Sequence, residues 1–269
     1  MTQISGALLF APAGRAEIIP KAARADMVIL DLEDGAGDIN RETAYENIIG
    51  SGLDPARTIV RIVGPESPHF AADVAMVQAS QFNLVMLPKV QGDLPEELTG
   101  LDIIAMIETP AAVVNIAKIA SDPKVIGLFW GAEDLTTFMG GTYSRFQTDE
   151  PNAGYRDAIR LTRALTLIHA AANGKFAIDA IHADFHDDEG LYVEALDAAR
   201  SGFAATACIH PRQVDIVRRA YLPESAQLEW AQRVVAAAAQ HPGAFQLDGQ
   251  MIDAPLVAQA EKIISRQPA

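Results

Sequence analysis

Two acidic residues each follow a short apolar segment, and their positions indicate a metal site. Glu108 directly follows the apolar run 103–107, and Asp134 comes four residues after the run 125–130. Short apolar runs bounded by turn residues are typical of buried parallel strands, whose carboxyl ends meet at one rim of the sheet. Mg2+ takes oxygen ligands from one or two carboxylates and from the substrate. The pattern predicts a Mg2+-dependent enzyme acting on a small, oxygen-rich substrate, with Mn2+ able to substitute.

Three further carboxylates, Asp31, Glu33 and Asp34, surround the end of another apolar run, 27–31. One interpretation is a turn whose aspartate caps the next helix. The other is a set of groups that hold the waters around the metal. Crowded like charges are costly unless a cation or hydrogen bonds offset them, so we favour the second interpretation and expect Glu33 to take part in catalysis.

Two basic residues also belong to strand-like segments. Arg61 lies within the apolar run 58–63, and Lys89 follows Pro88 just after the run 84–87. On an edge strand Arg61 would face solvent, but a closed barrel has no edge, so the guanidinium must point into the barrel or its mouth. There it can bind a carboxylate or an oxyanion through two parallel hydrogen bonds. Lys89 could form a Schiff base with a keto substrate, but the metal pair makes that unnecessary, so we expect an electrostatic role.

The glycine-flanked segment 131–141 is interpreted as a loop beside the metal site. The backbone N–H groups of Gly131 and Ala132 could hold a substrate carboxylate there. His182 and His186 have the spacing of two metal ligands on a helix, but a third ligand is not evident, so we do not predict a zinc site.

The composition indicates one compact enzyme. The chain has 269 residues and a mass of 28.8 kDa, and α/β barrels need about 250 residues. A net charge of −14 opposes binding to nucleic acid or to an anionic membrane surface. No apolar run approaches the roughly 18 residues of a membrane span, and the amino terminus lacks the features of a signal peptide. With Cys208 as the only cysteine, an internal disulfide is impossible, and we expect a cytoplasmic protein.

Strand-like runs alternate with segments long enough for helices, which is typical of a parallel sheet. Eight strands are predicted, at 7–10, 27–31, 58–63, 84–87, 103–107, 125–130, 175–179 and 204–209. Helices are predicted at 15–25, 41–49, 70–81, 111–120, 154–172 and 188–201, and an eighth barrel helix from Pro211. Eight such units favour a (β/α)8 TIM barrel over a doubly wound open sheet.

About fifty residues follow the last barrel helix. We predict that residues 1–222 form the barrel and that 223–269 form a carboxyl-terminal helical extension, which is not an independent domain. The extension should contain helices at 225–240 and 256–265, joined by a turn or short hairpin because proline and glycine lie between them.

Eight short segments, in this order, resemble the citrate lyase β-subunit-like family of the HpcH/HpaI aldolase superfamily. They are LLFAPAGR at 8–15, LDLEDG at 30–35, VRI at 60–62, LPK at 87–89, IE at 107–108, GAED at 131–134, IHPRQ at 209–213 and GQMID at 249–253. None is specific alone, but together they span nearly the whole chain. The resemblance implies a lyase that cleaves a 3-hydroxyacyl-CoA, such as malyl-CoA or citramalyl-CoA, into an acyl-CoA and glyoxylate or pyruvate.

The resemblance also implies roles for single residues. Glu108 and Asp134 would hold Mg2+, and Arg61 would contact the keto acid. Arg15 and Lys89 would lie towards the coenzyme A thioester.

Two more residues receive roles by the same resemblance. Arg145 would also meet the thioester carrier. Asp253 would cross to a neighbouring subunit and exchange the proton at the acyl-CoA α-carbon, which implies a homo-oligomer, a trimer or a multiple of trimers, with shared active sites. Val63 departs from the asparagine common in the family, which leaves the accepted acyl group open.

Three alternatives keep the fold and change the activity. The chain could be a citryl-thioester lyase subunit of a complex, a noncatalytic protein that binds coenzyme A or a keto acid, or an aldolase for free hydroxy-keto acids.

Overall fold

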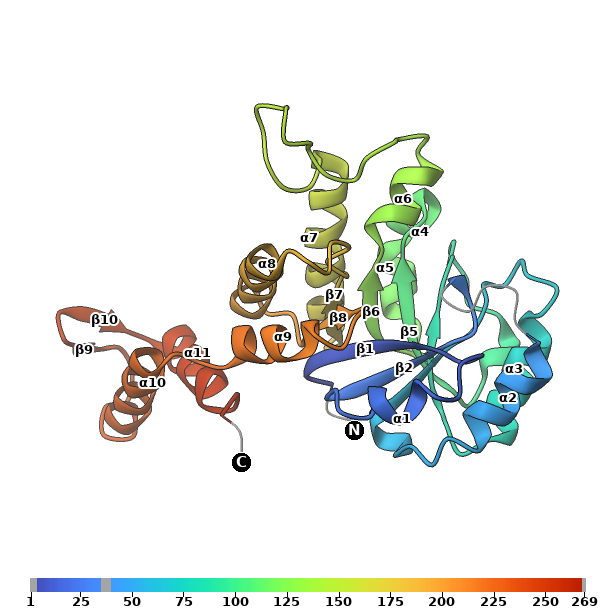
Figure 1. Cartoon of the computed structure of the whole chain (residues 1–269). Helices are drawn as coiled ribbons and strands as arrows, with labels where there is room; N and C mark the ends of the chain where they lie inside the picture. The colour runs from blue at the N-terminus through green and yellow to red at the C-terminus, as the bar shows by residue number, and fades with distance from the viewer. Residues whose placement is uncertain (1–3, 35–39, 268–269) are drawn as a thin grey trace. The chain divides into compact units, whose positions relative to one another are not determined.

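The computed structural model describes residues 4–34 and 40–267, and its centre is a closed barrel of eight parallel strands (Figure 1). The strands are β1 (Gly6–Pro12), β2 (Met27–Asp31), β3 (Thr58–Arg61), β4 (Leu84–Leu87), β5 (Asp102–Ile107), β6 (Val125–Trp130), β7 (Phe176–Asp179) and β8 (Ala205–Cys208). Each strand pairs with the next, and β8 pairs with β1. The predicted (β/α)8 barrel is therefore confirmed, and the open-sheet alternative is wrong. Gly35, which ends the predicted acidic turn, lies outside the described residues.

The side chains inside the barrel explain why polar residues gather at one end. Met27 and Ile29 of β2, Ile59 of β3 and Ile104 of β5 belong to one buried apolar cluster. Because side chains alternate between the two faces of a strand, the same inward positions continue to the carboxyl ends of the strands. The next inward positions are Asp31 on β2 and Arg61 on β3, and on β5 the series Ile104 and Met106 continues to Glu108, directly after the strand. An apolar filling thus lies below a charged layer at the carboxyl-terminal rim.

Helices follow most of the strands along the chain. In the barrel unit they are α1 (Ile19–Ala22), α2 (Arg41–Ile49), α3 (Phe70–Ala79), α4 (Pro110–Val114), α5 (Ile116–Ser121), α6 (Ala132–Phe138), α7 (Asp157–Ala172) and α8 (Asp188–Ser201), with short 3-10 turns η2 (Pro55–Arg57) and η3 (Glu96–Leu98). Side-chain oxygens of Asn40, Thr109 and Asp187 accept N–H bonds at the starts of α2, α4 and α8. None of the helices among the described residues is both long and apolar enough to cross a membrane.

Three predicted segments differ from the structure. The helix expected at 15–25 is the single turn α1, because Pro20 is tolerated only in the first turn of a helix. The helix expected at 111–120 is interrupted at Asn115, whose side-chain amide donates to the Gln91 carbonyl. The loop expected at 131–141 contains α6, which two acidic residues in its first turn favour through the helix dipole.

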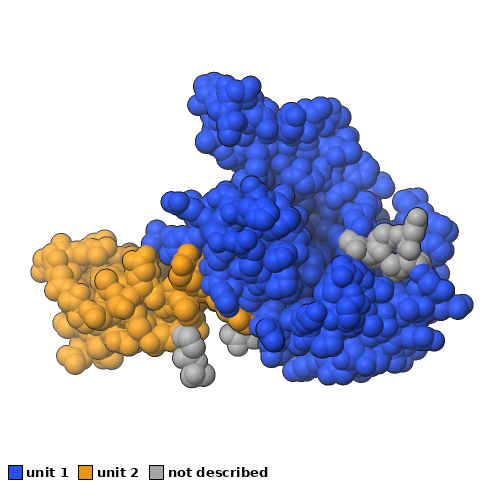
Figure 2. All heavy atoms as spheres, in the orientation of Figure 1, with its two compact units in different colours: residues 1–217 blue, residues 218–269 orange. Residues whose placement is uncertain are grey.

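The remaining residues form a second compact unit, Arg218–Ala269, coloured separately in Figure 2. The division from the barrel unit falls within α9 (Gln213–Tyr221). The second unit contains α10 (Ser225–Ala238), the hairpin strands β9 (Phe245–Leu247) and β10 (Gln250–Ile252), and α11 (Ala254–Ile264).

The predicted hairpin of this unit is confirmed. Its two-residue turn, Asp248-Gly249, has positive φ at both positions, as a type I′ turn requires. Ala231 and Val234 of α10 and Ala260 of α11 belong to the small apolar core of the unit, which also includes Ile252.

Gly127 on β6 provides a test of barrel packing. A Cβ atom at this position would lie 2.2 Å from Cε2 of Phe176 on the neighbouring strand β7. We expect Gly127→Ala to lower the free energy of unfolding by about 1–3 kcal/mol, because the Phe176 ring must move within a packed core. Urea denaturation would measure the loss, and Phe176→Leu in the same chain should recover part of it. Equal losses in both backgrounds would contradict this explanation.

Candidate functional site

A cavity of about 430 Å³ lies at the carboxyl ends of the barrel strands. Its polar lining consists of Asp31, Asp34, Arg61, Glu108, Glu133 and Asp134. The other lining residues are apolar or glycine: Phe10, Pro12, Met106, Phe129, Trp130, Gly131, Ala132, Ala180, Ile181 and Ile209. The cavity can therefore contact a charged group on one part of a ligand and an alkyl group on another. It is also large enough for a small acid, since ligand pockets begin at about 300 Å³.

Glu108 and Asp134, the predicted metal ligands, line the same cavity. Glu108 is 1% exposed, and one of its oxygens accepts the Lys89 N–H at 2.7 Å. Burial raises the pKa of Glu108 to about 8, and the charges of Asp134 and Glu33 add to this effect. Burial also raises the pKa of Asp134, against the opposing charge of Lys89. Both carboxyl groups thus lie where a nearby cation would stabilise their ionised form.

Gly131 leaves the space that the Glu108 carboxyl group fills. A Cβ atom at Gly131 would lie 2.8 Å from Oε2 of Glu108 and 2.9 Å from its Cβ. The Gly131 N–H donates to the Ile107 carbonyl at 3.3 Å, so this N–H is already paired within the barrel. Both residues predicted to hold a substrate carboxylate line the cavity: Ala132 is the first residue of α6, and Gly131 also makes room for Glu108.

Arg61 points into the barrel mouth, as predicted, but its two-donor edge already has a partner. Nε and Nη2 each donate to an oxygen of Asp31 at 2.7 Å. The third nitrogen, Nη1, lies 3.0 Å from Oε2 of Glu33, and the guanidinium stacks on Phe10. Burial alone would lower the pKa of Arg61, but the hydrogen bonds and charge of Asp31 outweigh it, and the pKa is raised. Arg61 is thus a fixed positive charge on the cavity wall.

Lys89 contacts three of the acidic groups, one through its backbone N–H and two through its ammonium. Its backbone is left-handed, with φ of 54°, and its N–H binds Glu108. Its ammonium donates to Glu33 at 2.5 Å and lies 3.5 Å from Asp34. Burial opposes this charge, but the Glu33 contact raises the pKa of Lys89, so the amine remains protonated. A protonated amine cannot attack a carbonyl, which supports the electrostatic role over the Schiff base.

Glu33 lies between the two cations. Its carboxyl group contacts both Arg61 and Lys89 and is not among the residues that line the cavity. Burial raises the pKa of Glu33 even though both cations oppose the shift. The structure therefore connects Glu33 to the site through Arg61 and Lys89, and the expectation that it holds the waters around the metal and takes part in catalysis stays a prediction.

Lys89 is likewise not among the residues that line the cavity, and neither are three further predicted site residues. Arg15 is exposed and pairs with Glu17 at 3.0 Å. Asp253 belongs to the second unit, where its Oδ1 accepts the Leu256 N–H at 3.5 Å as the cap of α11. Arg145 forms a two-fold ion pair with Glu194 of α8, which the sequence did not predict.

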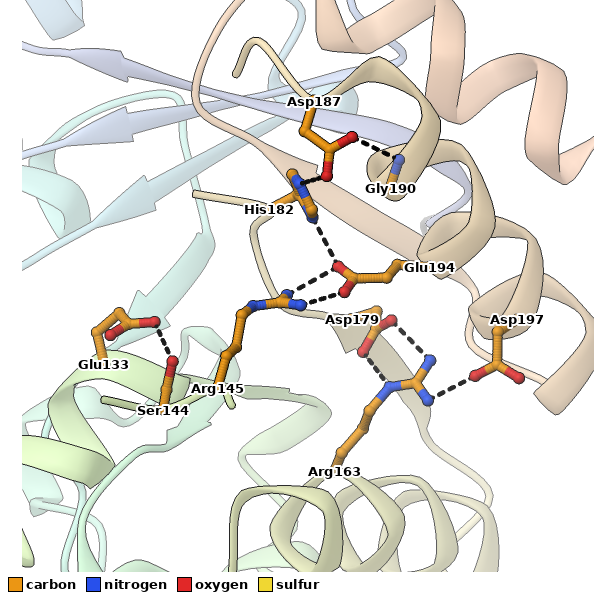
Figure 3. Close-up of polar contacts among 10 residues, drawn as sticks. All are labelled: Glu133, Ser144, Arg145, Arg163, Asp179, His182, Asp187, Gly190, Glu194 and Asp197. Atoms are coloured by element: carbon orange, nitrogen blue, oxygen red, sulfur yellow. Dashed lines mark hydrogen bonds and ion pairs between the residues drawn. The ribbon is translucent and has the colours of Figure 1, made fainter. Parts of the chain in front are cut away.

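The Arg145–Glu194 pair continues into a small network (Figure 3). Nδ1 of His182 lies 2.8 Å from Glu194, and its Nε2 lies 3.3 Å from Asp187. Burial would raise the pKa of Glu194, but hydrogen bonds from His182 and Arg145 dominate and lower it to about 2. The same bond to Glu194 raises the pKa of His182. His182 thus belongs to an ion-pair network and not to a metal site.

Asp179, which the sequence analysis missed, supports the cavity wall. It follows the inward-facing Ile178 at the end of β7 and is 5% exposed. It accepts the indole N–H of Trp130 at 2.7 Å and two hydrogen bonds from Arg163, both 2.9 Å (Figure 3 shows the Arg163 pair). Glu108 was predicted because it is a carboxylate at the end of an apolar strand, and Asp179 has the same feature in the sequence.

The site fits a hard divalent cation. The metal-binding groups that line the cavity are carboxylates, which Mg2+ prefers, and among the described residues the lining contains neither histidine nor cysteine. In the part of the chain that the structure describes, histidine, cysteine, aspartate and glutamate do not form a cluster of three or more suited to a metal. Glu108 and Asp134 would accordingly supply two ligands, and water or substrate oxygens the others.

The chain is similar to known proteins over nearly its whole length. The family model described as HpcH/HpaI aldolase/citrate lyase matches residues 7–102 and 95–211. The citrate lyase subunit beta-like protein of Mycobacterium tuberculosis is 43% identical over 260 residues, which cover 96% of this chain and 94% of that protein. The mitochondrial citramalyl-CoA lyase of Rattus norvegicus is 28% identical, with 96% of this chain and 85% of the relative covered.

A solved structure is similar over the same length. The crystal structure of protein CitE from Mycobacterium tuberculosis, in complex with magnesium, acetoacetate and coenzyme A, has a TM-score of 0.90 and 41% sequence identity. The match covers 99% of each chain.

The raised pKa of Glu108 predicts a specific pH dependence of stability without divalent cations. Between its ordinary pKa near 4.5 and about 8, folded Glu108 retains a proton that the unfolded chain releases. The stability from this proton is complete below pH 4.5 and lost as the pH rises to 8, by about 1.4 kcal/mol per pH unit. We therefore expect Glu108→Gln to gain stability relative to the wild type between pH 5 and 8, measured by urea denaturation in EDTA. Exposed Glu42→Gln is the control, and parallel pH curves for Glu108→Gln and the wild type would contradict the prediction.

Proposed function

The chain belongs to the HpcH/HpaI aldolase/citrate lyase family and is a lyase, and from that premise we propose that it cleaves a carbon–carbon bond in a 3-hydroxyacyl-CoA. The products would be an acyl-CoA and a 2-keto acid, glyoxylate from a malyl-CoA or pyruvate from a citramalyl-CoA. The observation that carries this proposal is the pair Glu108 and Asp134 in one cavity at the barrel mouth. The related structure with bound magnesium, acetoacetate and coenzyme A supports the choice of ligands.

Glu108 and Asp134 would hold Mg2+ through their carboxylate oxygens. When bound, Mg2+ supplies a Lewis acid that lowers the pKa of the substrate hydroxyl and stabilises the keto acid product. The raised pKa values of the two carboxyl groups also make Mg2+ binding depend on pH, because a proton and the metal compete for the same oxygens.

Other residues in the cavity wall and beside it bind and orient the substrate. Arg61 and Lys89 provide positive charge near the reacting carboxylate and the enolate that forms when the carbon–carbon bond breaks. Asp31 fixes the direction of the Arg61 guanidinium, so that little reorganisation is needed during the reaction. Phe10, Met106 and the other apolar lining residues exclude water from the enolate until it is protonated.

Protonation of the enolate needs an acid, and we assign this role to Asp253 of a neighbouring subunit. The assignment rests on the family resemblance of the GQMID segment. Asp253 belongs to the second unit, where it caps α11, and the barrel does not require it for closure. The proposal makes the protein a homo-oligomer with shared active sites, a trimer or a multiple of trimers.

Removal of the metal should abolish turnover. We expect EDTA to stop keto acid release from malyl-CoA and citramalyl-CoA, and Mg2+ or Mn2+ to restore it. Glu108→Ala and Asp134→Ala should each lose Mg2+ binding in calorimetry and nearly all activity, because each removes a charge and a coordination position. Exposed Glu42→Ala is the matched control. Activity that survives chelation, or unchanged Mg2+ affinity in either variant, would refute the metal site, and turnover only with a carrier-protein thioester would indicate a subunit of a complex.

Asp253 allows a complementation test of the shared site. We expect Asp253→Asn to keep Mg2+ and thioester binding but lose most of its turnover, because the amide cannot donate a carboxyl proton. Mixed with inactive Glu108→Ala protein under conditions of subunit exchange, it should regain partial activity in hybrid sites. Absence of recovery, with exchange verified by mass spectrometry, would mean that Asp253 serves its own barrel or does not take part in the chemistry.

A further inference from the structure

Asp73 of α3 is a fully buried carboxylate that does not line the cavity. Its Oδ1 accepts hydrogen bonds from Arg41 at 2.5 Å and from the Tyr45 hydroxyl at 2.6 Å, both on α2. Its Oδ2 accepts the backbone N–H of Val63 at 3.1 Å, two residues after Arg61. One carboxyl group thus connects two helices with the end of β3.

Arg41 extends this connection to the end of β2. A second nitrogen of its guanidinium donates to the Leu32 carbonyl at 3.1 Å, and the Leu32 N–H donates to the Arg61 carbonyl at 2.9 Å. Leu32 lies between Asp31 and Glu33, the two acidic partners of Arg61. A continuous series of hydrogen bonds therefore leads from Asp73, through Arg41 and Leu32, to the backbone of Arg61.

The contacts of Asp73 are those of a fixed group. The Asp73 side chain is inaccessible to solvent, and that of Arg41 is 19% exposed. Breaking this ion pair would leave a buried charge without its partner, which carries a large desolvation cost. Burial and the neighbouring Asp73 raise the pKa of Tyr45 to about 12, so its hydroxyl stays a donor across the pH range of ordinary assays. The bond from Asp73 to the Val63 N–H is a contact with the backbone, so it fixes the course of the main chain just after β3.

We propose that Asp73, with Arg41 and Tyr45, is a positioning group that sets the ends of β2 and β3 and thereby directs Arg61 and Glu33 at the cavity. Its importance for substrate binding rests on the proposed function, but its effect on Arg61 does not. The hydrogen bonds of Asp73 described above go to α2 and to the segment just after β3, whereas Glu108 and Asp134 follow β5 and β6. Loss of Asp73 should accordingly disturb the guanidinium site and leave the metal site intact.

The direct test follows the Nε–H signal of Arg61 by 15N NMR, assigned by its loss in Arg61→Lys. We expect Asp73→Asn to shift or broaden this signal and to speed its hydrogen exchange, because Arg41 loses its charged partner. The signal of Arg57, which donates to the Asp26 carbonyl near the other end of the barrel, should not change. An unchanged Arg61 signal in folded Asp73→Asn would overturn the proposal.

A matched variant separates positioning from a general loss of stability. Asp26→Asn alters another strand-connecting carboxylate, which accepts the Ala7 N–H at 2.9 Å near the amino-terminal end of the barrel. In Asp73→Asn we expect kcat/KM and the affinity for pyruvate to fall about tenfold to a hundredfold, with the Mg2+ dissociation constant unchanged. Asp26→Asn should be assayed at a urea concentration that gives it the same free energy of unfolding as Asp73→Asn. Its kcat/KM, pyruvate affinity and Mg2+ dissociation constant should then stay close to those of the wild type. Equal losses in the two variants, or a parallel loss of Mg2+ affinity in Asp73→Asn, would show a merely structural role.

Tyr45→Phe keeps the test decisive if Asp73→Asn does not fold. It removes one hydrogen bond from Asp73 and leaves the ion pair with Arg41 in place. The same changes, smaller in size, should follow, and an unchanged Arg61 signal in Tyr45→Phe would then overturn the proposal. If wild-type protein binds neither pyruvate nor glyoxylate, the proposed function fails, while the NMR comparison still decides the role of Asp73.

Discussion

Repulsion between buried carboxylates at one end of a closed barrel is the constraint on which the other features of the site depend. Glu108 is almost inaccessible to solvent, and this burial, together with the charges of Asp134 and Glu33, raises its pKa to about 8. A barrel without edges cannot direct these groups outwards, since every inward position at the strand ends faces the same opening. The structure offsets the repulsion with Arg61 and Lys89, and a divalent cation would complete the balance.

The two cations stabilise different parts of this acidic rim. Arg61 binds Asp31 through two donors and approaches Glu33 with the third nitrogen, so its orientation is fixed. Lys89 binds Glu33 with its ammonium and Glu108 with its backbone N–H. Glu33, shared by both, makes the ends of β2, β3 and β4 one charged assembly. This explains why the contacts behind β2 and β3 matter although they do not reach the cavity.

Much of this arrangement could be predicted from the sequence, because it follows from the alternation of strand and helix. The barrel, the convergence of Glu108 and Asp134, and the inward direction of Arg61 all follow from apolar runs that end in charged residues. The partners of these residues could not be predicted, since they come from distant segments. Asp31 occupies the edge of Arg61 that a substrate was expected to bind. Arg145 similarly pairs with Glu194, 49 positions away.

The left-handed backbone of Lys89 has a consequence for how its substitutions must be interpreted. A non-glycine residue in this conformation carries strain of about 1–3 kcal/mol, and here the strain directs an N–H at Glu108. Alanine would remove the ammonium and keep the strain, whereas glycine would remove both. The two substitutions therefore test different features: alanine tests the ammonium alone, whereas glycine tests the ammonium and the backbone strain together. The ammonium and the amide of Lys89 act as separate functional groups, and evolution can exchange the first only within the limits that the second imposes.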